Sequence, residues 1–420
     1  MNKFALSLVA IAPLWVCTMP VQADPLSLKL GETVTYDSNY ARNATNQTEV
    51  VSSTGVTLGI DKLYGRQSYV ASGNFSVNKH KNFKEQDNNS YAINGRFASE
   101  IASNWAVSLN GASSQRLNST ENNPLNQRLV KNEVSQHDVG MNLQYGVAGR
   151  WSLLGSLGAT RTSYSLASYR YQNRDQNSGG LRMVYNTSDL LSFGIGGSAA
   201  NSNYPNQIVA GVPEEISQRS LDFSTNWQVT GFSRLDAILS YAKNKYKSDS
   251  NADYKGFTGR MNWNFKPRGA TSYLLAVSRS TNNDGSGTGL RNNVRENVDT
   301  NFGPLPIGRY VDTNINSVTT SIDGTVRWQP LAKLGFAATL GLDRFDTSRS
   351  STNGSAGKTS SDYRVVSLSS DYNFSRAISL GCAVQQYKQS AESNAQVASN
   401  TQRVAHDGQQ LSCNASFTID

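Results

Sequence analysis

The sequence predicts an all-β protein, a transmembrane antiparallel up-and-down β-barrel of about eighteen strands, with sixteen as the alternative count. Three observations predict this fold. Apolar and polar residues alternate with a period of two along most of the chain. Short turns alternate with longer polar loops between these segments. After the first residues, no apolar run is long enough to form a membrane-spanning helix.

The clearest hairpin lies between Ser220 and Lys243. Apolar side chains occupy every second position, which is the period of a strand with two unlike faces. The turn between its two halves contains Gly231, whose backbone freedom suits a tight reversal. The first series on the apolar face is Leu221, Phe223, Thr225, Trp227 and Val229, and the second is Leu235, Ala237, Leu239 and Tyr241.

The same alternation predicts the other strands in chain order. Before the hairpin they include Leu26 to Tyr36, Val56 to Ile60, Tyr69 to Val77, Tyr91 to Ile101, Trp105 to Leu109, Val139 to Tyr145, Trp151 to Ala159, Leu181 to Tyr185 and Leu191 to Ile195. After it they include Phe257 to Phe265, Tyr273 to Val277, Val326 to Trp328, Leu334 to Leu342, Val366 to Phe374, Ile378 to Val384 and Leu411 to Ile419.

Longer polar loops are expected at residues 117–132, 203–216 and 281–314. The loop at 203–216 contains proline, and proline within a run argues against a strand. A loop as long as 281–314 is usually functional or disordered, and in a barrel it would narrow the pore or cap it. A barrel of about eighteen strands encloses a water-filled channel instead of a side-chain core.

The composition fits such a wall. The chain has 420 residues, of which 37% are hydrophobic and only 17% charged, and it is rich in uncharged polar side chains. The net charge of +8 is scattered, without a basic run interleaved with aromatic residues. This pattern excludes nucleic acid as the expected partner.

Residues 1–23 have the features of a secretory signal: Lys3, an apolar core from Phe4 to Val16, and a small-residue cleavage site ending at Ala23. The rest, 24–420, is expected to form a single barrel domain. An export signal followed by β-hairpins predicts the outer membrane of a bacterium, where the partner of the outward face is lipid.

The tryptophans after the signal segment follow the same plan. Each lies within a few residues of a predicted short turn, and none lies in a long loop. Such a distribution is typical of an aromatic girdle at one membrane interface, although half-buried strand residues are the simpler explanation. The five residues are Trp105, Trp151, Trp227, Trp263 and Trp328.

Two cysteines lie in the predicted last hairpin. A constant register that pairs Ile378 with Phe417 and Leu380 with Ala415 also pairs Cys382 with Cys413. Directly opposed cysteines in an oxidising compartment favour a disulfide; two small apolar thiols facing lipid are the alternative. No further ligand has a suitable spacing, so no metal site is expected.

Catalysis is not expected either. The three histidines, His80, His137 and His406, all fall at predicted outer strand ends. Ser135 and His137 share one strand face, but a nucleophile also needs a base within reach and a group that orients the base. No glycine-rich phosphate loop opens a helix. The sequence therefore predicts neither an enzyme nor a cofactor.

The inward faces carry amides, hydroxyls and a few arginines. Amides and hydroxyls both donate and accept hydrogen bonds, which suits the hydroxyl groups of sugars. The alternative is a hydrated wall that binds nothing, because any barrel lumen must be polar. The lumen-lining candidates are Asn94, Arg96, Asn142, Asn226, Gln228, Arg260, Asn262 and Asn264.

An ordered set of segments resembles one family: VTYDSN at 34–39, DKLYGRQSY at 61–69, SNYPNQ at 202–207, NWQVTGFSRLDA at 226–237 and TGRMNWNFKPRGATS at 258–272. They are similar to the outer-membrane β-barrel proteins of exopolysaccharide operons, the EpsL type, which are grouped with β-barrel porins. The resemblance covers most of the chain after the signal segment.

This resemblance implies a channel or scaffold in exopolysaccharide biosynthesis and export, with the polysaccharide chain and an inner-membrane export machinery as partners. It carries over no catalytic or binding residues and no oligomeric state. The alternative function is a general or solute-specific porin in which the 281–314 loop forms the constriction.

Overall fold

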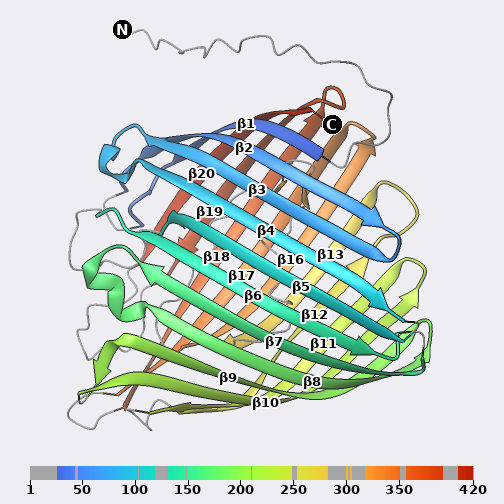
Figure 1. Ribbon diagram of the computed structural model, residues 1–420. Coiled ribbons are helices and arrows are strands. Elements are labelled where there is room, and N and C mark those ends of the chain that lie inside the picture. The colour runs from blue at the N-terminus through green and yellow to red at the C-terminus, as the bar shows by residue number, and fades with distance from the viewer. Residues whose placement is uncertain are drawn as a thin grey trace, which may run out of the picture.

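The computed structural model is a closed antiparallel β-barrel (Figure 1). Its eighteen strands form one sheet, and the pairing of β1 with β20 closes the barrel. The predicted architecture and strand number are thus confirmed. The structure describes residues 26–42, 46–102, 104–118, 130–147, 149–209, 211–247, 253–281, 299–300, 303–304, 317–350, 356–390 and 405–419. The predicted signal segment 1–23 and nearly all of the predicted loop 281–314 lie outside these residues.

The strands are long, and each pairs with its neighbours in sequence. Two short 3-10 helices, η1 (Lys84–Gln86) and η2 (Ala167–Gln172), occupy connections, and β14 (Asp299–Thr300) pairs with β15 (Gly303–Pro304). In the described part of the chain, no helix has the length and apolar character needed to cross a bilayer. The barrel strands are β1 (Leu26–Asp37), β2 (Glu49–Tyr64), β3 (Gln67–His80), β4 (Asn88–Ile101), β5 (Trp105–Leu117), β6 (Glu133–Tyr145), β7 (Trp151–Tyr164), β8 (Arg174–Ser188), β9 (Leu191–Val209), β10 (Val212–Thr230), β11 (Ser233–Tyr246), β12 (Tyr254–Phe265), β13 (Thr271–Thr281), β16 (Ser317–Leu331), β17 (Leu334–Ser350), β18 (Ala356–Asn373), β19 (Ile378–Gln389) and β20 (His406–Ile419).

The two ends of the barrel differ. Tight turns such as the one between β10 and β11 lie at the right in Figure 1, and we call this the short-turn end. The start of β1 and the end of β20 lie there too. The helices η1 and η2 lie at the opposite, long-connection end. Apart from the two-residue connection between β9 and β10, which lies at the long-connection end, the described connections sort by length onto two sides, as in up-and-down membrane barrels.

The outward face is apolar and uncovered by protein. Paired residues of adjacent antiparallel strands point to the same side, so each rung of the sheet presents one kind of surface. Large side chains on this face are widely exposed, with Leu157 at 64% and Leu368 at 61%. A continuous apolar surface of this kind requires lipid around it.

The predicted tryptophan positions are confirmed. Each lies at or near the short-turn end of its strand, and each is exposed on the outward face. Trp151 contacts Tyr185 with ring centroids 4.5 Å apart. The indole Nε1 of Trp263 donates a hydrogen bond to the hydroxyl of Ser233 at 2.9 Å. A tryptophan with an apolar ring and a bonded N–H suits a membrane interface. The aromatic side chains thus form a girdle at one membrane interface.

The predicted loop at 203–216 is wrong. Apart from residues 210 and 211, its residues belong to β9, which extends to Val209, and to β10, which begins at Val212. The register shifts at this place, since Pro213 pairs with Ile208 whereas the next residue, Glu214, pairs with Tyr204. Pro205 is one of the residues 205–207 of β9 that have no partner in β10. A proline cannot donate to the ladder but is tolerated at a bulge, so the strands pass through it.

Candidate functional site

The eight predicted lumen residues all lie on the face opposite the exposed apolar belt, and they fall on two parts of the wall. Five of them come from β10 and β12, which flank β11. The other three, Asn94, Arg96 and Asn142, come from β4 and β6, which flank β5. The structure therefore brings the candidates together as two polar walls.

The first wall has two polar rungs near the short-turn end. Asn226 pairs with Asp236, which pairs with Asn262 on the other side. The neighbouring rung contains Arg234, whose Nε lies 3.0 Å from Oδ2 of Asp236 and whose second nitrogen donates to Oδ1 at 3.1 Å. The amide of Asn226 also donates to Asp236. One carboxylate therefore orients an arginine and an amide on the lumen face.

The sequence interpretation missed Arg234 and Asp236 as lumen residues. Their signal was present, because they are two positions apart on the polar side of the hairpin. A pair at this spacing on one strand face lies within reach of a fork-shaped guanidinium. The mutual pairing offsets their charges and leaves amides as the main groups that are free to meet a solute.

The second wall is richer in small polar groups. Asn94 pairs with Ala112, Arg96 with Asn110, and Asn142 with Ser108. The amide of Asn142 donates to the hydroxyl of Ser108 at 3.3 Å. Amides and a hydroxyl, which both donate and accept hydrogen bonds, therefore lie on this part of the lumen face.

The inward faces around the barrel differ in exposure. Asn94, Arg96 and Asn142 are exposed, whereas many inward side chains of β16 to β20 are buried. The buried set is small and polar and includes Thr325, Thr339, Ser367, Gln385 and Ser412. The wall made by β4 to β6 is thus the more water-accessible side of the lumen.

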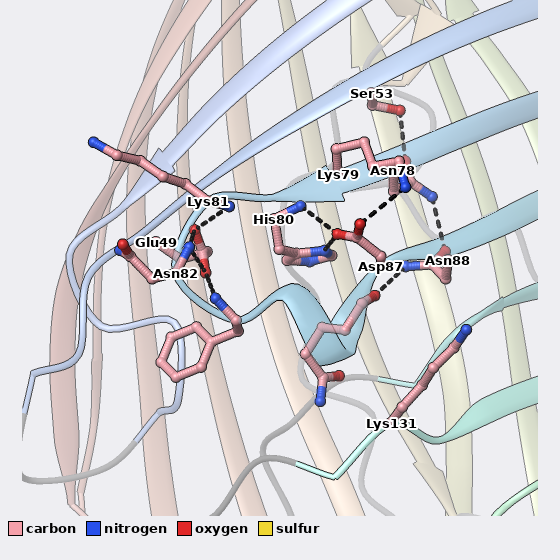
Figure 2. A network of polar contacts seen from close by, with 12 residues as sticks. Glu49, Ser53, Asn78, Lys79, His80, Lys81, Asn82, Asp87, Asn88 and Lys131 are labelled. Carbon is pink, nitrogen blue, oxygen red and sulfur yellow. Dashed lines mark hydrogen bonds and ion pairs between the residues drawn. The ribbon is translucent and has the colours of Figure 1, made fainter. Parts of the chain in front are cut away.

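A polar network organises the long-connection end (Figure 2). The carboxylate of Glu49, at the start of β2, is 0% exposed. It accepts hydrogen bonds from the backbone N–H groups of Lys81 at 2.9 Å, Asn82 at 3.0 Å and Phe83 at 2.7 Å. These donors belong to the connection that contains η1. One buried anion therefore holds that connection against the barrel.

Asp87 completes the same connection. It accepts from the backbone N–H of His80 at 2.8 Å and from Nζ of Lys79 at 2.9 Å, as Figure 2 shows. Both bonds favour the ionised form, and they lower the pKa of Asp87 from its ordinary value. Tyr40 approaches from the preceding connection and stacks on Phe83, with ring centroids 5.6 Å apart. Burial, aided by the nearby carboxylates of Glu49 and Asp37, raises the pKa of Tyr40.

A second network ties the closing seam of the barrel. Asp37, the last residue of β1, forms an ion pair of 2.8 Å with Arg42 and accepts from the hydroxyl of Tyr387 on β19 at 2.8 Å. The guanidinium of Arg42 lies 4.0 Å from the centre of the Tyr387 ring. Gly408 pairs with Tyr387, and a Cβ at Gly408 would overlap the phenol. Residues far apart in sequence thus meet where β1 joins β20.

The structure does not assemble the Ser135 and His137 pair. Nδ1 of His137 lies 2.9 Å from the hydroxyl of Ser113, on the adjacent strand. In the described part of the chain, no carboxylate hydrogen-bonds to His137. The base therefore lacks the orienting group that nucleophilic catalysis requires. Likewise, no group of three or more metal-ligating side chains occurs among the described residues.

The two cysteines are opposed as the sequence register predicts, and that register is confirmed along the whole last hairpin. Their Cα atoms are 4.1 Å apart, and the structure joins the sulfurs. We expect no free thiol when purified, unreduced protein without residues 1–23 is denatured and titrated. A Cys413→Ser variant should show one thiol and serves as the control. Two reactive thiols in the parent protein would contradict the disulfide.

No protein-family model and no curated protein matches the sequence. Solved structures match it in fold alone. OpdQ of Pseudomonas aeruginosa is 12% identical with a TM-score of 0.48, over 95% of this chain and 99% of that one. OccK1 (OpdK) of Pseudomonas aeruginosa is 11% identical with a TM-score of 0.47, over 94% and 98%. The FrpB iron transporter of Neisseria meningitidis is 7% identical with a TM-score of 0.47, over 95% and 82%.

Proposed function

We propose that this protein is an outer-membrane channel or scaffold that serves in exopolysaccharide biosynthesis and export. The observation that carries the proposal is the accessible lumen wall of β4 to β6, which presents several amides and hydroxyls to the channel. Sugars present hydroxyl groups that need both donors and acceptors, and amides supply both. Many weak and equivalent hydrogen bonds would hold a polymer in line without trapping it at one place.

The outward surface supports the location. An apolar belt with an aromatic girdle at its short-turn end fits the lipid of an outer membrane. The polysaccharide itself is inferred from the resemblance of the ordered segments to the EpsL-type proteins. An inner-membrane polymerisation and export machinery would then deliver the chain to the short-turn end.

The test is the amount of secreted polysaccharide in a clean deletion strain. Secretion should fall and should return when the gene is restored. Restoration with Asn94→Leu plus Asn142→Leu should return less polymer, because the accessible wall loses two amides. The matched control is Asn177→Leu plus Asn201→Leu, a paired couple on the outward face, which should restore secretion fully. Unchanged secretion in the deletion strain would refute the export function.

The second candidate function is a porin for small solutes. It is favoured by the paired charges on the lumen, since Arg234 with Asp236 and Arg182 with Asp222 create local fields in a wall that has few other fixed charges. A porin should conduct ions in planar bilayers and leave polysaccharide secretion intact on deletion. The two functions therefore give opposite results in the secretion assay.

A further inference from the structure

Three cations share one rung on the outward face, close to the long-connection end. Arg219 of β10 pairs with Lys243 of β11, and Lys243 pairs with Lys255 of β12. We call these residues the basic triad. We propose that the basic triad binds the phosphate groups of a phosphorylated glycolipid in the outer leaflet of the membrane.

The triad points away from the lumen. On β11, Ala242 and Asn244 on either side of Lys243 face inward and are 0% exposed, whereas Lys243 itself is exposed. Arg219 and Lys255 are exposed as well. Since cross-strand partners share a side, all three cations project from the same outward surface.

The described residues provide no counter-charge for these side chains. Within the described residues, none of the three forms an ion pair. The outward carboxylate of Glu215, further along β10, is already engaged by Nζ of Lys247 at 3.3 Å. Like charges directly opposite each other destabilise a sheet. An anion from outside the protein would relieve this repulsion.

Three other outward cations near this end are paired within the protein. Lys79 contacts Asp87 at 2.9 Å, Arg161 contacts Asp175 at 2.6 Å, and Arg344 contacts Asp346 at 3.2 Å. The basic triad differs from these three cations because three neighbouring strands contribute a cation each to one rung, without an acid on that rung. That arrangement suits a ligand with more than one phosphate.

The surface beside the triad identifies the ligand as a lipid. The adjacent rung toward the short-turn end consists of Leu221, Tyr241 and Phe257, which are 62%, 41% and 60% exposed. Acyl chains that pack on this apolar rung would bring their headgroup to the level of the triad. Cations at a membrane surface attract anionic lipid headgroups.

The choice of lipid follows from the position of the triad and depends on the outer-membrane location proposed above. The triad is near the end opposite both chain termini, which in an outer-membrane barrel is the external side. The lipid of the external leaflet there is a glycolipid with phosphate groups on its sugars. A glycerophospholipid would be the ligand on the other leaflet.

The experiment uses the full barrel folded in detergent and native mass spectrometry. The probes are bis-phosphorylated lipid A, its dephosphorylated form and phosphatidylglycerol. We expect lipid A to bind, and Arg219→Gln, Lys243→Gln and Lys255→Gln together to weaken it by at least about tenfold. The matched control removes three outward charges that are paired, by Lys79→Gln, Arg161→Gln and Arg344→Gln, and should bind as the parent does.

Folding of both triple variants is checked by the change in gel mobility on heating. Equal lipid A binding by the folded parent and triad variant would overturn the proposal. Equal binding of dephosphorylated lipid A would overturn it as well, because phosphate would then not be recognised. Binding of phosphatidylglycerol as tight as that of lipid A would overturn the glycolipid assignment. Polysaccharide secretion is measured separately, so failure of the export function and failure of lipid binding are distinguishable.

Discussion

Replacing Asp37 with alanine should lower the free energy of unfolding by about 3–5 kcal/mol, because the change leaves a buried guanidinium without its carboxylate. The side chains of Asp37 and Arg42 are only 5% and 11% exposed. The same carboxylate accepts a hydrogen bond from the hydroxyl of Tyr387, and the substitution would remove that bond. The loss would fall on the seam between β1 and β20, where the barrel closes.

The measurement is a reversible urea titration of the barrel in lipid vesicles. Asp175→Ala is the control, because Asp175 forms a short ion pair with Arg161 on the exposed surface. Exposed ion pairs contribute little to stability, so the control should unfold at the same urea concentration as the parent protein. Tyr387→Phe should lower the free energy of unfolding less than Asp37→Ala does, because it removes a hydroxyl and leaves the ion pair of Asp37 with Arg42. Equal stability of parent and Asp37→Ala would contradict the role assigned to the seam.

Replacing Glu49 with alanine should release the connection between β3 and β4. The backbone N–H groups of Asn82 and Phe83 would lose the Glu49 carboxylate as acceptor in a site closed to water, whereas the N–H of Lys81 would keep the carbonyl of Val50. Each buried unsatisfied donor costs about 1–3 kcal/mol. We expect hydrogen exchange at the amides of Asn82 and Phe83 to accelerate by about 100-fold, because the connection would open locally while the strands stay paired.

Glu49→Gln keeps the shape and one carbonyl acceptor, so its amides should exchange at rates between those of the parent and the alanine variant. Glu215→Ala is the control, since Glu215 is an exposed glutamate near the same end of the barrel, with a single surface contact to Lys247. Its substitution should leave exchange at residues 81–83 unchanged. Parent-like exchange in Glu49→Ala would show that the connection is held by other contacts.

The lumen candidates were predictable because inward and outward residues alternate along every strand that crosses lipid. Once the apolar face of β4 or β12 was recognised, Asn94 and Asn262 had to lie on the other side. Glu49, Asp37 and Tyr387 could not be found in this way. Asp37 and Tyr387 meet only because the barrel closes, and nothing in the sequence near either residue indicates the other.

The ends of the strands also show which features the sequence predicts and which depend on the tertiary structure. The sequence predicted a strand from Leu334 to Leu342, whereas β17 extends to Ser350. The residues beyond Leu342 include Asp343, Arg344 and Asp346, so they lack an apolar face. They stay in the sheet because the backbone of β18 supplies their hydrogen-bond partners.

The sequence by itself determined the fold class, the strand number, the aromatic girdle and the register of the last hairpin. Each depends on the period-two pattern, which arises because the face of a strand in contact with lipid must carry apolar side chains. Only the tertiary structure decided the passage of β9 and β10 through Pro205, the length of the strands beyond the apolar belt, and the networks of Glu49 and Asp37. Outside lipid both faces of a strand tolerate polar residues, so hydrogen bonding between distant segments, and not the local pattern, fixes the structure there.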